Sequence, residues 1–132
     1  MSDHSSQAQG YVDEMAARRG YVLEYHKALA HNDFPVLRAA NDVVSAVYLD
    51  QRTLSRQTKE LLFIVALVAQ RASRAHIMGH IRVALSLGVT PTEILEAIEI
   101  LLPEAGVVVF QEGVEAWLEA TDAPRLEPSA TL

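Results

Sequence analysis

The amino-acid sequence predicts an all-α protein of about six helices. Apolar residues recur at intervals of three to four through most of the chain, which is the spacing of one face of a helix. Capping residues separate the periodic stretches. The stretch Val107 to Phe110 (VVVF) has the composition of a strand, but no second strand is available to pair with it, so we expect it to be helical.

The first third of the chain predicts two or three helices. Residues 10–31 carry a loose three-to-four spacing that Gly20 interrupts, which fits one helix or a helix pair. Asp33 can cap the next helix, which has Pro35 in its first turn and should extend to about Tyr48.

Two apolar helices are expected in the middle of the chain. Ser55 can cap the first of them, which carries the run of residues 61–69 (LLFIVALVA) to about Gln70. The nine residues of this run are too few for a membrane span, which needs about 20, so the run reads as a buried helix. The second helix covers residues 72–87 and ends at Gly88, a residue suited to a helix C-terminus.

The clearest local signal is residues 90–93 (TPTE). Its threonine is an N-cap, its proline occupies the first helical position, and its glutamate completes a capping box. The pattern predicts a helix over residues 92–102 that stops at Pro103, followed by a last helix over residues 106–121.

The length of 132 residues favours a single domain, which we place at residues 10–122. Residues 1–9 are small and polar and are expected to be disordered, and residues 123–132 are expected to form a loose tail. Half of the residues are apolar and the mean hydropathy is +0.12, which is high for a small monomer. We therefore expect the surplus apolar surface to lie in the subunit interface of a homo-oligomer.

Several classes of function are disfavoured by composition. A net charge of −6 argues against a nucleic-acid partner. The absence of cysteine excludes disulfides, thiol catalysis and cysteine-ligated zinc, and it is compatible with a cytoplasmic protein. No apolar signal-peptide core is visible in residues 1–10 and no membrane partner is expected.

Two histidines, His76 and His80, lie one turn apart on the predicted helix 72–87. A histidine on an apolar helix is often a structural, hydrogen-bonded residue, and two at this spacing can also share a metal ion. The segment HIMGH lacks the glutamate of the zinc-protease motif HExxH, so no metal is assigned. Proton transfer is the third interpretation, with Glu60 or Glu104 as a carboxylate partner.

The order and spacing of several residues resemble the carboxymuconolactone decarboxylase family, which includes the alkylhydroperoxidase-D-like (AhpD-like) proteins. The resemblance rests on His80, Gly88, Glu93 and Gly106, together with residues 54–61 (LSRQTKEL) upstream. It covers roughly residues 20–120 and implies a helical fold that assembles into trimers or hexamers. Its peroxidase branch uses a CxxCxxxH motif.

Aligned on His80, the two cysteine positions of that motif are Ser73 and His76 in this chain. Neither can form a disulfide or a sulfenate, so thiol peroxidase activity is excluded. The resemblance therefore implies the cysteine-free, decarboxylase branch, a lyase that acts on products of aromatic compound catabolism. The Arg-x-Arg of that branch is replaced by residues 57–59 (QTK), which favours a substrate with fewer carboxylates.

The resemblance implies a reaction without a metal or an organic cofactor. His80 is the expected general acid, Glu60 orients it or shuttles its proton, and His76 is a second acid or a neutral donor. Arg74, Arg71 and Glu104 are the expected substrate-binding residues.

Three other functions stay open. One is a related isomerase or cyclase that works by proton transfer on a different small molecule. Another is a non-catalytic helical oligomer that binds a small ligand. The last is a metal-binding protein.

Overall fold

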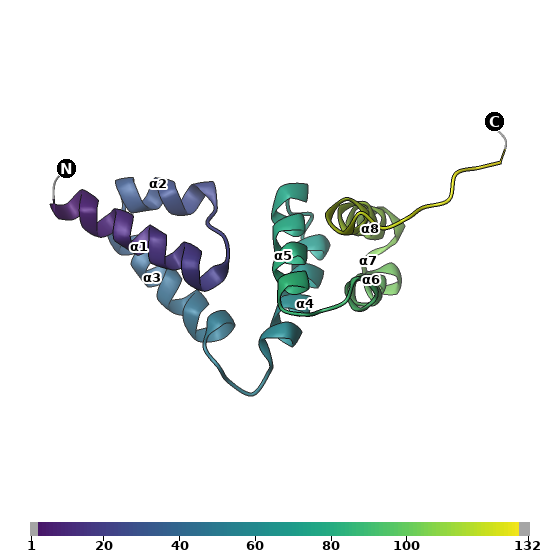
Figure 1. The fold of residues 1–132 in the computed structure, drawn as a ribbon, viewed down its shortest axis with the longest axis horizontal. Coiled ribbons are helices and arrows are strands. Elements are labelled where there is room, and N and C mark those ends of the chain that lie inside the picture. Colours follow the sequence, from purple (N-terminus) through teal and green to yellow (C-terminus); the bar gives the residue numbers. More distant parts are fainter. Residues whose placement is uncertain (1–2, 130–132) are drawn as a thin grey trace. The chain divides into compact units, whose positions relative to one another are not determined.

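The computed structural model describes residues 3–129, and all regular secondary structure within this range is helical (Figure 1). The all-α prediction is therefore confirmed. The chain divides into two compact units, an N-terminal unit (Met1–Arg56) and a C-terminal unit (Gln57–Leu132). The boundary falls inside residues 10–122, which we expected to form one domain.

The described part of the N-terminal unit contains four helical segments: α1 (Asp3–Arg19), α2 (Glu24–Asn32), α3 (Phe34–Val44) and the π-helix η1 (Ser45–Leu49). Helix α1 covers residues 3–9, which we expected to be disordered. Ala8 and Met15 lie on the buried face of α1 and pack with Phe34 and Leu37 of α3. Burial of this apolar face explains why the polar N-terminal segment is helical.

The N-terminal unit contains the helix pair that the spacing allowed. Helix α1 ends at Gly20, which has a φ of 87°, and its amide donates to the carbonyl of Ala16. Helix α3 starts directly after Asp33, but the Asp33 side chain makes no capping hydrogen bond. The π-helix at the end of α3 buries Tyr48, whose ring lies 4.6 Å from the guanidinium of Arg56.

Up to residue 129, the C-terminal unit contains five helices, of which the first begins one residue before the unit: α4 (Arg56–Ala69), α5 (Arg74–Ser86), α6 (Pro91–Glu99), α7 (Leu101–Ala105) and α8 (Val107–Thr121). Helix α8 packs on α5, α6 and α7. It also meets α4, because Gly113 of α8 faces Val68 of α4 and Ile98 of α6. A β carbon at position 113 would lie only 2.8 Å and 2.9 Å from methyl groups of these residues. Glycine therefore allows the close approach of three helices.

The predicted helix over residues 92–102 does not stop at Pro103. It breaks after Glu99, and Pro103 lies in the first turn of α7, where a proline needs no amide hydrogen bond. The predicted capping box is present, because Thr90 Oγ1 accepts from the Glu93 amide and Glu93 accepts from the Thr90 amide. The VVVF stretch forms the first turn of α8.

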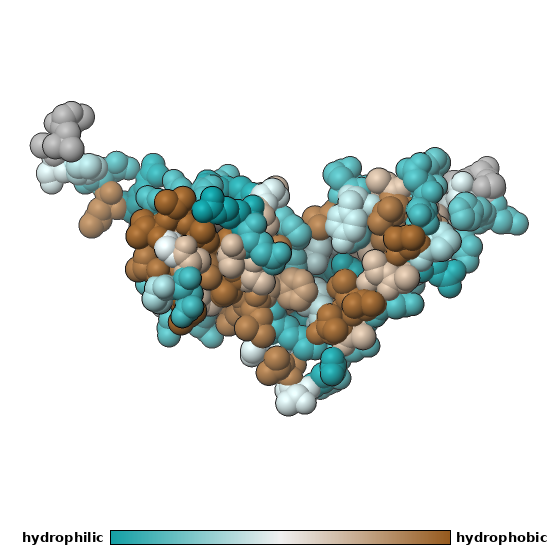
Figure 2. All heavy atoms as spheres, turned by 180° about the vertical axis from the view of Figure 1, so that it is seen from behind, coloured by the Kyte–Doolittle hydropathy of each residue, from teal (hydrophilic) through white to brown (hydrophobic). Residues whose placement is uncertain are grey.

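Large apolar side chains remain exposed on each unit (Figure 2). On the C-terminal unit they include Leu62, Ile100, Val107 and Val108. Among the described residues, no helix combines the length and the apolar character needed to cross a bilayer. Residues 123–129 follow α8 without helix or strand.

Candidate active site

His80 of α5 and Glu60 of α4 form a buried pair. The Nδ1 atom of His80 contacts Oε1 of Glu60, and the two residues are only 1% and 0% exposed. A carboxylate is costly to bury unless a hydrogen bond or an opposite charge compensates for the lost hydration. The contact between the imidazole and the carboxylate therefore gives each buried polar group a partner inside the C-terminal unit.

Phe63 fixes the imidazole ring of His80 from one side. The two ring centroids are 5.2 Å apart and the ring planes differ by only 17°, which is a stacked arrangement. Phe63 follows Glu60 by three residues on α4, so both side chains face α5. Together they determine the position and the orientation of the imidazole.

His76 lies beside this pair and is only partly buried. It precedes His80 by one turn of α5, and the ring centroids are 5.3 Å apart. The pKa of His76 is lowered, first by burial and then by the charge of His80. His76 is therefore mostly neutral at pH 7 and can accept a proton. Its backbone amide donates to Ser73 Oγ, the N-cap of α5.

The surroundings of the two histidines bear on whether they bind a metal ion or have a purely structural role. Within residues 3–129, no group of three or more His, Cys, Asp or Glu side chains is placed to bind a metal ion. A purely structural role would be favoured by two fully buried histidines with backbone partners. Instead, the partner of His80 is a carboxylate and His76 is partly accessible.

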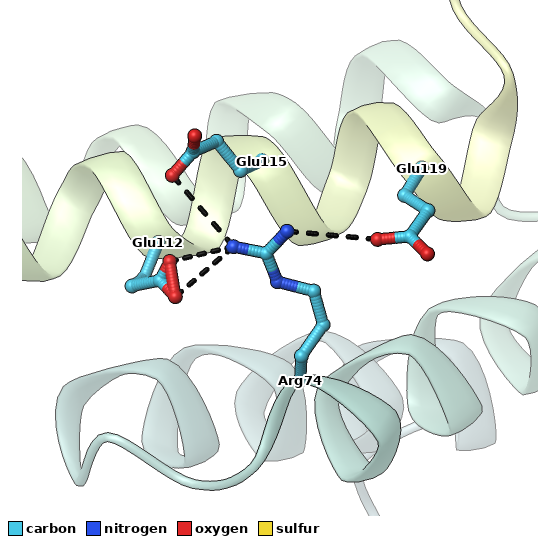
Figure 3. Close-up of polar contacts among 4 residues, drawn as sticks. All are labelled: Arg74, Glu112, Glu115 and Glu119. Atoms are coloured by element: carbon cyan, nitrogen blue, oxygen red, sulfur yellow. Dashed lines mark hydrogen bonds and ion pairs between the residues drawn. The ribbon is translucent and has the colours of Figure 1, made fainter.

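Arg74 is surrounded by carboxylates of α8 (Figure 3). Its Nη2 atom lies 2.6 Å from Glu112 and 3.7 Å from Glu115, and its Nη1 atom lies 3.5 Å from Glu119. These groups raise the pKa of Arg74, and the hydrogen bond to Glu112 is the largest cause. A substrate carboxylate would have to compete with three glutamates for this guanidinium.

The other two predicted substrate-binding residues, Arg71 and Glu104, lie on different segments of the C-terminal unit. Arg71 follows α4 and, with Arg74, lines a pocket of about 180 Å³. Glu104 is exposed on α7. His76, His80 and Glu60 are absent from the lining of that pocket.

The model of the carboxymuconolactone decarboxylase family matches residues 35–119. This chain belongs to that family. The match runs from α3 into α8 and includes the His80–Glu60 pair. Comparisons with curated proteins and with solved structures gave no significant match.

Family membership supports a function of the carboxymuconolactone decarboxylase or AhpD-like type. The chain has no cysteine, so a thiol-based reaction is not available to this family member.

Two residues near the pair were missed or undervalued in the sequence. Lys59 is buried at the start of α4, directly before Glu60. Phe63 is the stacking partner of His80, a contact that the sequence analysis did not include. The signal for Lys59 was a lysine at the very start of an apolar run, and the signal for Phe63 was its three-residue spacing from Glu60.

Proposed function

We propose that this protein is a cofactor-free carboxy-lyase that acts on a small unsaturated lactone or carboxylic acid by histidine-mediated proton transfer. The observation that carries the proposal is the buried His80–Glu60 pair with the partly buried His76 beside it. Membership of the family supports the reaction class.

In the proposed reaction, the bond between the substrate carboxylate and a conjugated carbon breaks and CO₂ leaves. The electron pair moves through the conjugated system onto the lactone carbonyl oxygen, which gives a dienolate. The imidazolium form of His80 then donates a proton to carbon, which restores the carbonyl and leaves His80 neutral. Because Nδ1 of His80 faces Glu60, the transfer goes through Nε2.

Glu60 holds the imidazole in one orientation and stabilises its protonated form. A carboxylate that accepts a hydrogen bond from Nδ1 fixes the tautomer and offsets the charge that develops on the ring. Phe63 restricts the ring further by stacking. Glu60 is therefore a positioning residue in this proposal.

His76 connects the buried pair to solvent. His80 is almost completely enclosed and must regain a proton after each turnover. His76 is mostly neutral, partly exposed and next to His80, so it can take a proton from water and pass it inwards.

Binding of the substrate carboxylate is assigned to Arg71 rather than to Arg74. Three glutamates already neutralise Arg74, whereas within residues 3–129 Arg71 makes no ion pair. We keep Glu104 as a proposed substrate contact because it lies directly before the Ala105–Gly106 pair. Its exposure on α7 adds no support for that role. The replacement of Arg-x-Arg by residues 57–59 supports a substrate with fewer carboxylates than carboxymuconolactone, of which Arg71 would bind one that is not lost as CO₂.

The same arrangement would serve an isomerase or a cyclase. Both reactions need a positioned acid–base residue and no cofactor. The altered residues 57–59 favour this second candidate, because they suggest a substrate different from carboxymuconolactone.

Assembly into a homo-oligomer, a trimer or a hexamer, is part of the proposal. Exposed apolar side chains such as Leu62, Ile100 and Val107 support it, because a monomer seldom leaves so many large ones in water. Light scattering after gel filtration gives the mass directly, and a monomer at micromolar concentration would contradict this part of the proposal.

The reaction is tested by incubating the purified protein with 4-carboxymuconolactone and related unsaturated lactone acids. Ultraviolet absorbance follows loss of the substrate and a coupled assay follows CO₂. We expect CO₂ release, a loss of at least about 100-fold in His80→Gln, and no change in His31→Gln, a matched control at an exposed histidine. An absorbance change without CO₂ would support the isomerase or cyclase instead, and no turnover of any acid would refute the proposal.

A further inference from the structure

A pocket lies where α4 and α5 are connected, and it is closed on one side by the start of α8. Its floor is apolar and consists of buried Val68, Ile77 and Val109, and its volume is about 180 Å³. Arg71 stands at its edge. Such a combination, an apolar floor with one cation, is typical of sites for small organic anions.

The backbone of Arg71 is in an unusual conformation. Its φ angle is 58°, in the left-handed region, and the Ala72 amide closes the end of α4 by donating to the carbonyl of Leu67 at 3.0 Å. Glycine is the usual residue at this position of a helix end, because any side chain is strained there. The helix end itself does not need an arginine, so the strain points to a use for the side chain.

The charges around the pocket single out the same residue. Arg74 also lines it, but Glu112, Glu115 and Glu119 already surround its guanidinium (Figure 3). Within residues 3–129, Arg71 has no carboxylate partner. Arg71 is therefore the cation that can pair with a bound anion without losing an existing ion pair.

We propose that this pocket binds a small monocarboxylate, with its carboxylate on Arg71 and its compact apolar part against Val68, Ile77 and Val109. A doubly charged anion such as phosphate would be disfavoured by the apolar floor and by Glu112. The carboxylate can belong to the substrate or to a separate acid. The proposal shares Arg71 with the proposed function, but binding is measured without turnover, so the failure of one can be distinguished from the failure of the other.

The test uses benzoate, titrated into the full-length protein and followed by the NMR shifts of valine methyl groups. We expect saturable shifts at Val68 and Val109. Arg71→Gly should weaken binding at least about 10-fold, the loss expected for one charge-assisted hydrogen bond, without lowering the melting temperature. The glycine relieves the left-handed strain, so this variant should fold.

A second variant and a control complete the test. Val108→Asp places an anion at the pocket edge and should also weaken binding at least about 10-fold, while an acidic residue in the first turn of α8 is favourable for folding. Arg82→Ala removes an exposed charge from α5 outside the pocket and should leave binding unchanged. Benzamide, which is neutral, should bind at least about 10-fold more weakly than benzoate.

Three results would overturn the proposal: no saturable shifts with benzoate, equal binding by Arg71→Gly and the wild type, or an equal loss in Arg82→Ala. If benzoate inhibits the proposed lyase competitively, the pocket holds the substrate carboxylate. If it inhibits non-competitively, the pocket holds a separate acid. Binding of benzoate without any lyase activity would refute the proposed function and support the binding proposal.

Discussion

The packing of α8 can be tested by adding a single methyl group, in the variant Gly113→Ala. The new β carbon would lie 2.8 Å from Val68 Cγ1 and 2.9 Å from Ile98 Cγ2, both shorter than a normal contact between carbon atoms. Val68 and Ile98 are β-branched and 2% and 0% exposed, so neither can move aside by a simple rotation. The helices themselves must separate.

The magnitude follows from two opposing effects. Overpacking of a well-packed core costs about 1–3 kcal/mol, and two contacts of this kind place Gly113→Ala in the upper half of that range. The higher helix propensity of alanine stabilises the folded state by about 1 kcal/mol. We therefore expect the free energy of unfolding to fall by a net amount of about 1–2 kcal/mol. At Gly79 no neighbouring atom lies within 4 Å of a β carbon, so Gly79→Ala should gain about 1 kcal/mol.

Urea unfolding followed by tryptophan fluorescence measures the difference. Trp117 is the only tryptophan and lies on α8, so its signal reports on the C-terminal unit. The midpoint should fall for Gly113→Ala and rise for Gly79→Ala. If both variants shift in the same direction, or if Gly113→Ala is as stable as the wild type, the described approach of α4, α6 and α8 is wrong.

Three further variants test charges and caps. The pKa of His76 is lowered in the folded state, so the unfolded chain binds more protons than the folded one. The free energy of unfolding should therefore fall as the pH drops below about 6.5. His76→Gln should reduce this dependence on pH, measured by urea titrations at several pH values. Arg74→Gln leaves three glutamates without their shared cation. It should lower the free energy of unfolding by about 1 kcal/mol at low salt and by less in concentrated salt, measured by thermal unfolding. Thr90→Ala removes the side-chain cap of α6 and should cost about 1 kcal/mol in the same assay. An unchanged pH slope, a salt-independent cost or a neutral Thr90→Ala would contradict the respective contact.

Features set by neighbouring residues were predicted well from the sequence. The capping box of Thr90 and Glu93 is complete within four residues, so no distant contact decides it. Pro103 was misread because a proline can start a helix as well as end one, and only the break after Glu99 shows which. The helix over residues 3–9 was missed because it depends on the packing of Ala8 and Met15.

Features that depend on distant residues were harder to predict. The spacing placed His80 on an apolar helix and left both Glu60 and Glu104 as partners, because periodicity does not say which helices meet. The glutamates around Arg74 lie 38 to 45 positions further along the chain, and nothing in the local pattern links them. The left-handed backbone of Arg71 was invisible, since no glycine marks it.

The central claim is that His80 and Glu60 act as one unit in proton transfer. A double-mutant cycle on kcat/KM, with His80→Gln, Glu60→Gln and the double variant, measures it most directly once a substrate is found. Circular dichroism must first show that all three variants are folded. We expect each single variant to lose at least about 100-fold and the double variant to lose little more than the worse single one. Losses that multiply, or a Glu60→Gln variant with full activity, would contradict the claim.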